Sequence, residues 1–242
     1  MVIKVFKDYD NLSRFAAKII AEQVHAKPNT VFCLPGGSSP IGMYKELVTM
    51  YKKGEVDFKD MIAFDMDAYI SLGPNHKNSY AYFNNIHFLN HVNVKESNRF
   101  MPNVFAENLE EEAIRYSEKI EEFGGLDISV TGVGDNGHIC FNEPGSYLLA
   151  KYHIANLHEE TIKANSRFFN DISEVPIQAF TLGLEEVMKC KTFLVIASGK
   201  KKAPILGKMF KNDHIYSEYP VTFLRMHPNC IFLLDEDAAS EI

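Results

Sequence analysis

The sequence has no excess of positive charge, no long apolar run and few cysteines. Lys and Arg number 25 against 32 Asp and Glu, and the net charge of −7 argues against a nucleic-acid or anionic-membrane surface, since such surfaces are usually basic. No segment has the apolar length that a membrane span needs, and the amino-terminal MVIKVFKDYD lacks the apolar core of a signal peptide. We therefore expect a cytoplasmic protein with no nucleic acid and no membrane among its partners. A single basic pocket for a small anionic substrate is still compatible with this composition.

The cysteines are not spaced for metal binding or for an evident disulfide framework. They are Cys33, Cys140, Cys190 and Cys230, and no pair forms a CxxC or zinc-type motif. Cys33 and Cys140 lie in apolar runs, where cysteine behaves as a small apolar side chain. We expect reduced, buried thiols and, because HxH and HExxH are also absent, no metal site.

Linkers rich in Pro or Ser, internal repeats and low-complexity tracts are also missing. Hydrophobic residues make up 46% and charged residues 24% of the 242 residues, as in an ordinary globular protein. A chain of this length buries most of its surface without disulfide or metal support. We expect residues 1–242 to form a single domain.

Apolar, strand-like segments alternate with helix-like segments along the whole chain. Strands are expected at 2–6, 30–35, 61–66, 126–134, 180–183, 192–199 and 230–236. Helices are expected at 11–26, 41–54, 107–122, 160–169, 184–189 and 201–210. This alternation predicts a three-layer α/β fold, with a mostly parallel Rossmann-like sheet and helices on both of its faces. Ligands bind beyond the carboxyl ends of such strands, so the chemistry is expected at 35–40, 65–69, 132–143 and 198–202.

The first candidate site is LPGGSSP (34–40), where a strand, a glycine turn and hydroxyl groups precede a helix. Backbone N–H groups and the helix dipole favour an anion at such a place. The loop fits neither GxxxxGK[ST] nor GxGxxG. An ordinary turn with a Ser at the helix N-cap is an equally good interpretation of these residues alone.

The second candidate is FDMDAY (64–69), where Asp65 and Asp67 follow an apolar strand. If the strand continues, two residues of spacing put both carboxylates on one face. A carboxylate withdrawn from water has a raised pKa and can act as a general base. The alternative is a solvated strand end.

The third candidate, GVGDNGHICFNEP (132–144), carries the most information. Asn136, His138, Asn142 and Glu143 are interleaved with apolar residues on one glycine-rich loop. A lone histidine is usually structural, but a histidine, an amide and a carboxylate on one such loop favour catalysis.

The fourth candidate consists of two segments that carry positive charge, ANSRFF (164–169) and SGKKKA (198–203). Arg167 has the bidentate fork that suits phosphate, and the lysines supply point charges. They are solvated surface cations unless they join the glycine loop around one anion.

The set LPGGSSPIGMYK, FDMDAY, GVGDNGHICFNEPGS, ANSRFF, AFTLG, SGKKKA and MHPN runs in this order over nearly the whole chain. It resembles the glucosamine-6-phosphate deaminase (isomerase) family. The related 6-phosphogluconolactonases share the fold and the glycine loop but lack the Asn-Glu-Pro after Gly-His. The resemblance implies an enzyme that converts an amino-sugar 6-phosphate and water to fructose 6-phosphate and ammonia, with no metal and no organic cofactor.

The resemblance also implies roles for particular residues. His138 would open the pyranose ring by moving a proton at the ring oxygen, while Asn136 and Glu143 orient it. Asp67 would take the proton from C2 of the open chain and return it at C1. The phosphate would be held by the glycine loop and two cations, which together are Gly36, Gly37, Ser38, Ser39, Arg167 and Lys202.

Some positions depart from the family pattern. Ala68 replaces the usual Glu after the catalytic Asp, Gly36 replaces the usual Thr, and Ile162 replaces an Arg. Three interpretations therefore stay open: a deaminase of glucosamine 6-phosphate, the same chemistry on galactosamine 6-phosphate, or a sugar-phosphate-binding paralogue with little turnover. Activation by N-acetylglucosamine 6-phosphate is not expected, because positions 153–156 lack the basic and hydroxyl groups of the family's activator site. A lid, if present, is expected at 144–160, and the sequence leaves open whether the protein is a monomer or a homo-oligomer.

Overall fold

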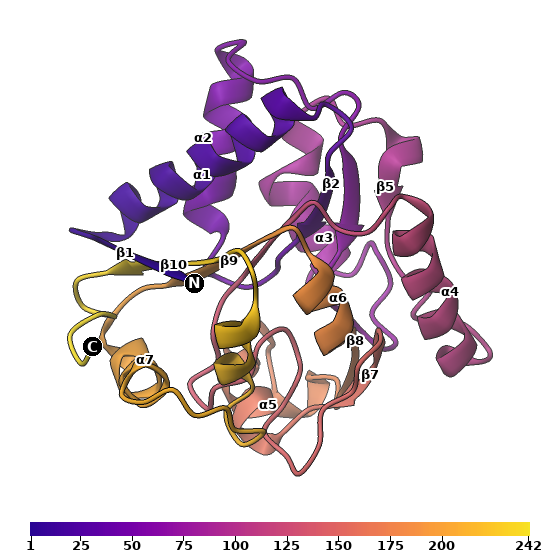
Figure 1. Ribbon diagram of the computed structural model, residues 1–242. Coiled ribbons are helices and arrows are strands. Elements are labelled where there is room, and N and C mark those ends of the chain that lie inside the picture. The colour runs from indigo at the N-terminus through magenta and orange to yellow at the C-terminus, as the bar shows by residue number, and fades with distance from the viewer.

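A seven-stranded parallel sheet forms the centre of the computed structural model, which describes all residues 1–242 (Figure 1). The strand order is β1-β10-β9-β6-β2-β3-β5, and all neighbouring strands are parallel. The strands are β1 (Val2–Phe6), β2 (Val31–Leu34), β3 (Ile62–Asp65), β5 (Arg99–Phe100), β6 (Ile128–Thr131), β9 (Thr192–Ala197) and β10 (Cys230–Asp235). The predicted α/β class with a mostly parallel sheet is confirmed.

Helices cover both faces of this sheet because its side chains alternate between them. From β2, Phe32 and Leu34 pack with α1 (Tyr9–Ala26) and α2 (Ile41–Lys52). Val31 and Cys33 point the other way, into a core shared with α4 (Leu109–Glu122), α6 (Leu184–Lys189) and α7 (Ala203–Phe210). Figure 1 shows α1 and α2 above the sheet and α6 and α7 below it. The three predicted layers are therefore present.

A second, smaller sheet was not expected from the sequence. It is antiparallel, in the order β4-β8-β7, and consists of β4 (Ala68–Tyr69), β8 (Gln178–Thr181) and β7 (His153–Asn156). The segment expected as a strand at 180–183 is thus a strand, but it begins earlier and lies outside the central sheet. An apolar run identifies a strand without identifying its partner, which is why the sequence missed this arrangement. Because β7 pairs with β8, residues 153–156 could belong to a lid only if β8 moved with them.

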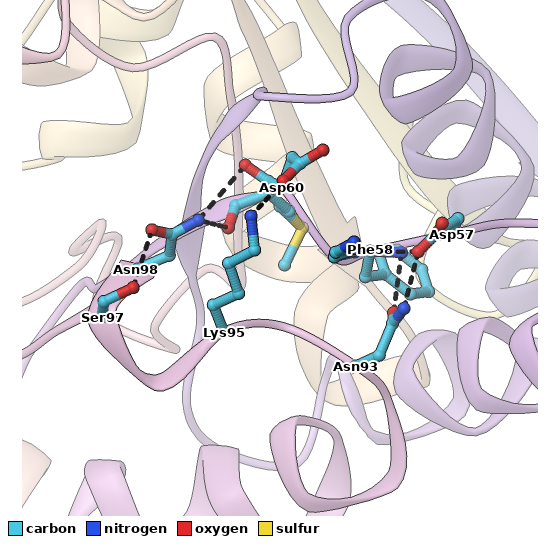
Figure 2. A network of polar contacts seen from close by, with 9 residues as sticks. Asp57, Phe58, Asp60, Asn93, Lys95, Ser97 and Asn98 are labelled. Atoms are coloured by element: carbon cyan, nitrogen blue, oxygen red, sulfur yellow. Dashed lines mark hydrogen bonds and ion pairs between the residues drawn. The ribbon is translucent and has the colours of Figure 1, made fainter.

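The start of β3 is held by polar contacts from the segment that leads into β5 (Figure 2). Lys95 Nζ lies 2.5 Å from Asp60 Oδ1, and Asn98 Nδ2 donates to the Met61 carbonyl at 3.2 Å. Asn93 accepts from the Phe58 N–H at 3.0 Å. These contacts fix the amino end of β3, opposite to the end that carries Asp65.

The chain changes direction across the sheet between β2 and β6. From β2 it runs outward through β3 to β5, and from β6 it runs outward the other way through β9 to β10. The loops after β2 and β6 therefore diverge and leave a crevice at the carboxyl ends of two adjacent strands, the usual place for a ligand. The remaining helices are α3 (Tyr80–His87), which follows β4 in the chain, and α5 (Glu159–Asn165), which follows β7.

Two expectations about composition can be compared with the structure. All four cysteines are buried and none is in a disulfide, as predicted. None of the helices combines the length and the apolarity that crossing a membrane requires.

Candidate active site

A cleft of about 870 Å³ opens where the loops after β2, β3, β6 and β9 meet α5. The regions 35–40, 65–69, 132–143 and 198–202, which the architecture predicted, all contribute to its wall. Every residue to which the resemblance gave a role lines the cleft except Glu143, which contacts His138 from outside the lining; the further candidates Asp65 and Asn142 lie outside it. The structure thus brings together side chains from six separate segments of the sequence.

The glycine loop leads into helix α2, where Tyr9 rather than a serine of the loop contacts the first turn: the Gly42 N–H donates to the Tyr9 hydroxyl at 2.9 Å. The N-cap of α2 is Pro40, which makes no capping hydrogen bond, and Gly37 adopts φ of +79° in the turn before it. The alternative of a Ser N-cap is therefore wrong. The positive end of the helix dipole, together with the backbone of the glycine loop and the Ser38 and Ser39 hydroxyls beside the cleft, suits an anion.

Two cations stand near this helix start. Arg167, just after α5, reaches Ser38 Oγ with Nη2 at 3.5 Å, and Lys202 Nζ lies 2.5 Å from Asp135 Oδ1. The Lys202 side chain is only 23% exposed, whereas that of Asp135 is 60% exposed. Both cations line the same cleft as the glycine loop, which weakens the interpretation as scattered surface charges. No sequence pattern indicated Asp135, whose carboxylate competes with any anion for Lys202.

Asp67 is a buried carboxyl group at the wall of the cleft. Its Oδ1 accepts a hydrogen bond from Thr181 Oγ1 at 2.7 Å, and the same hydroxyl accepts from the Phe141 N–H at 2.8 Å. Burial raises the pKa of Asp67 to about 7, although the Thr181 hydrogen bond opposes this shift. Near neutral pH, Asp67 is therefore able both to accept and to release a proton. The alternative interpretation of Asp67 as part of a solvated strand end is therefore wrong.

Asp65 and Asp67 do not share a face as one continuous strand would place them. β3 ends at Asp65, and a bend at Met66 separates it from β4. Asp65 accepts a hydrogen bond from Asn84 Nδ2 at 2.7 Å, away from Thr181. The bend gives the two carboxyl groups different partners, and only Asp67 lines the cleft.

The loop after β6 fixes the position of His138 through its glycines. A Cβ at position 134 would lie 2.4 Å from the imidazole, so only glycine lets the ring pack on this turn. Gly137 has φ of +91°, a conformation that other residues rarely adopt. The His138 N–H donates to Asn136 Oδ1 at 3.1 Å, which closes the turn between them.

Glu143 and Asn136 hold the imidazole from behind. Asn136 Nδ2 donates to Glu143 Oε2 at 2.9 Å, and that oxygen lies 3.4 Å from His138 Nδ1. Burial alone would raise the pKa of Glu143, but hydrogen bonding to His138 and the charge of the imidazolium hold it at about 2. Ionised Glu143 keeps a proton on Nδ1, which leaves Nε2 of a cleft-lining histidine to exchange a proton with a ligand.

Tyr80 is a cleft residue that no sequence signal indicated. Its ring stacks on Tyr69 with centroids 5.0 Å apart and touches the bare backbone of Gly36, where a Cβ would lie 1.9 Å from Cδ1. Gly36 is thus required by packing, and the tyrosine ring occupies the space that a side chain at position 36 would need. Asn165 Nδ2 completes the contact by donating to the Tyr69 hydroxyl at 2.9 Å.

Ala68 lies opposite Phe180 in the small sheet and is buried outside the lining of the cleft. With Asp65 it borders a separate cavity of about 10 Å³. Ala68 itself therefore contributes nothing to the wall of the main cleft. No three His, Cys, Asp or Glu side chains in the structure lie together in a way that could hold a metal ion.

Comparison with known proteins gives a consistent result along the whole chain. Residues 8–232 match a family described as glucosamine-6-phosphate isomerases/6-phosphogluconolactonase. A protein of Thermoanaerobacter pseudethanolicus named glucosamine-6-phosphate deaminase is 45% identical over 242 residues, which are 100% of this chain and 95% of the relative. A protein of the same name from Clostridium perfringens strain 13 is 45% identical over 239 residues, 99% of this chain and 98% of the relative.

Solved structures agree with these sequence matches. A structure described as a monomeric glucosamine-6-phosphate deaminase superposes with a TM-score of 0.97 at 34% identity, covering 100% of both chains. The 6-phosphogluconolactonase from Trypanosoma cruzi has a TM-score of 0.79 at 18% identity, covering 100% of this chain and 96% of the other. The second likeness is one of fold alone.

Proposed function

The chain belongs to the glucosamine-6-phosphate isomerase/6-phosphogluconolactonase family, and we propose that it is a glucosamine-6-phosphate deaminase. The reaction converts glucosamine 6-phosphate and water to fructose 6-phosphate and ammonia. The observation that carries the proposal is one cleft with a buried Asp67, a His138 backed by Glu143, and an anion site at the start of α2. The relatives that bear this name support it.

The anion site binds the 6-phosphate. The backbone N–H groups of the glycine loop and the Ser38 hydroxyl donate to phosphate oxygens, and Arg167 and Lys202 neutralise their charge. Lys202 exchanges Asp135 for the phosphate when the substrate arrives, because Asp135 is mostly exposed and is readily solvated. This contact anchors one end of the sugar and directs its ring toward the carboxyl ends of β3 and β6.

His138 opens the ring. Its Nε2 gives a proton to the ring oxygen as the C1–O5 bond breaks, and the C1 hydroxyl loses its proton to become an aldehyde. Before this transfer the His138 ring carries a proton on each nitrogen, and the Glu143 carboxylate stabilises its positive charge. Asn136 holds the Glu143 carboxylate in place by a hydrogen bond. The C1 hydroxyl gives its proton to His138, so the histidine ends the step with the same number of protons as it had at the start.

Asp67 then moves a proton along the open chain. It removes the proton from C2, the electrons form a C1–C2 double bond, and the aldehyde oxygen takes the proton that His138 received from the C1 hydroxyl, which gives an enolamine. Return of the proton to C1 gives an imine at C2, and water adds to this imine and releases ammonia. A base with a pKa near 7 suits both steps, because near neutral pH it can accept the proton from C2 and can also release it to C1.

We propose further that residues 1–242 act as one domain and that a single chain is sufficient. The first and last strands, β1 and β10, pair in the same sheet, so the two ends of the chain belong to one folded unit. All the groups named above come from one chain.

The test is ammonia release from purified protein with glucosamine 6-phosphate and galactosamine 6-phosphate in parallel. Release from the first and little from the second supports the proposal. Faster release from galactosamine 6-phosphate would assign the other epimer, a second candidate suggested by the unusual Gly36–Tyr80 contact in the cleft. Thermal stabilisation by both sugars without ammonia release would instead indicate a sugar-phosphate-binding protein.

A further inference from the structure

Tyr9, at the start of α1, contacts the glycine loop but does not line the cleft. Its hydroxyl donates to the Ser39 carbonyl at 2.8 Å and lies 3.3 Å from the Ser38 carbonyl. The same oxygen accepts a hydrogen bond from the Gly42 N–H, in the first turn of α2, at 2.9 Å. One phenol group thus joins the end of the loop to the helix that follows it, and the proposed mechanism does not use this group.

The position of Tyr9 depends on the close packing of α1 against α2 (Figure 1). A Cβ at position 42 would lie 2.9 Å from Tyr9 Cε1, so a residue larger than glycine would push the tyrosine ring away from the start of α2. Glycine is a poor helix former, and its presence in the first turn of α2 has a cost in stability. In return, Gly42 lets the Tyr9 hydroxyl reach both its own N–H and the carbonyl groups of the loop.

The backbone N–H groups of the glycine loop are the donors that this contact affects. Four successive N–H groups on the wall of the cleft donate to no acceptor within the protein, those of Gly36, Gly37, Ser38 and Ser39. In a trans peptide the C=O and the N–H that follows it point in opposite directions. Because the Ser38 carbonyl is directed toward Tyr9, which lies outside the cleft, the Ser39 N–H is directed away from Tyr9 and toward the cleft.

We propose, on the basis of the proposed deaminase function, that Tyr9 is a positioning residue that holds the glycine loop in its phosphate-binding conformation. Successive backbone N–H groups that face one point form a site for an anion. Without the Tyr9 hydroxyl, the carbonyl groups of Ser38 and Ser39 lose this donor, and their peptides can rotate. A carbonyl oxygen turned toward the cleft repels the phosphate and replaces an N–H that would bind it. Tyr9 touches neither the phosphate nor the reacting carbon atoms, so it acts on substrate binding and not on the chemical steps.

The test is the steady-state kinetics of Tyr9→Phe with glucosamine 6-phosphate, beside the unchanged enzyme. Phenylalanine keeps the ring between α1 and α2 and removes only the hydroxyl. KM for the substrate and the inhibition constant of inorganic phosphate should both rise roughly 3- to 10-fold, as expected for the loss of one hydrogen bond. The value of kcat should stay within about 2-fold, because Asp67 and His138 are held by contacts that do not include Tyr9.

The matched control is Tyr216→Phe, the same substitution at another half-buried tyrosine. The Tyr216 hydroxyl is hydrogen-bonded to His214 Nδ1 at 2.6 Å, and neither residue lines the cleft. This variant keeps the KM and the phosphate inhibition of the unchanged enzyme. The melting temperatures of both variants are measured without ligand. If Tyr9 had only a structural role, its variant would have a lower melting temperature but the same KM and the same phosphate inhibition.

Unchanged KM and unchanged phosphate inhibition in an active Tyr9→Phe variant overturn the inference and leave the proposed function standing. A fall in kcat without a rise in KM overturns it as well. If the unchanged enzyme releases no ammonia, the proposed function fails, and calorimetric titration with inorganic phosphate decides the inference without activity. Weaker phosphate binding by Tyr9→Phe than by the unchanged protein and by Tyr216→Phe then supports the inference. Equal binding by all three proteins, or no binding by the unchanged protein, overturns it.

Discussion

The contact between Gly36 and Tyr80 allows the sharpest prediction about the cleft. A Cβ at position 36 would lie 1.9 Å from Tyr80 Cδ1, whereas ordinary contact begins at 3.4 Å, so the ring must retreat by 3.4 − 1.9 = 1.5 Å. The ring cannot move freely, because it stacks on Tyr69 and packs against Phe141. Overpacking of this kind costs about 1–3 kcal/mol. Gly36→Ala is therefore expected to lower the melting temperature by roughly 3–10 °C for a chain of this size.

The same displacement changes binding, because Tyr80 lines the cleft. We expect Gly36→Ala to raise KM for glucosamine 6-phosphate more than it lowers kcat, since the ring is displaced from the cleft wall while Asp67 and His138 stay in place. Differential scanning fluorimetry and ammonia release measure the two effects on one preparation.

A double-mutant cycle separates this clash from general damage to the loop. Tyr80→Leu removes the ring, so adding it to Gly36→Ala should recover most of the lost stability. Gly37→Ala is the control, because no atom lies within 4 Å of a Cβ there and its cost comes from φ of +79° alone. Tyr80→Leu should not rescue Gly37→Ala. Equal rescue of both variants, or none of either, would refute the reasoning.

Three further predictions follow from the polar contacts of the site. Thr181→Val removes the hydrogen bond that favours ionised Asp67, so the pKa of Asp67 rises and the acid limb of kcat/KM moves to higher pH; a limb that moves down would contradict the assignment of the base. Asp135→Asn removes the carboxylate that pairs with Lys202, so inorganic phosphate should inhibit the enzyme roughly 2- to 5-fold more strongly, as expected for the loss of an exposed ion pair. Added salt should reduce this difference. Unchanged inhibition would show that Lys202 does not belong to the phosphate site. His138→Ala should slow turnover of the closed sugar far more than that of an open-chain analogue, and equal losses would reject its role in ring opening.

The sequence predicted six strands of the central sheet, because they are continuous apolar runs flanked by helices with an apolar face, but it did not predict the two-residue strand β5. The positions of the loops at the carboxyl ends followed from that architecture, and the cleft joins those loops. β4 has only two residues, and β7 (HIAN) has a polar residue at each end, so neither forms an apolar run and the small antiparallel sheet was missed.

Site residues that lie close together in the sequence could be predicted, whereas those brought together by tertiary packing could not. His138, Asn136 and Glu143 lie on one loop, where the sequence itself keeps them near one another. Thr181 and Tyr80 come from distant segments and reach the cleft only through tertiary packing, so no local pattern indicated them. The bend at Met66, which separates Asp65 from Asp67, likewise depends on the pairing of β4 with β8.

The most direct test of the account is deuterium incorporation at C1 of fructose 6-phosphate in heavy water containing ammonium. The proposed mechanism passes a proton through Asp67 to and from C1, so the unchanged enzyme should exchange this hydrogen with solvent. Asp67→Asn should keep binding the sugar phosphate and show no exchange above the uncatalysed rate. Exchange that persists in a folded Asp67→Asn variant would contradict the account and place the base elsewhere in the cleft.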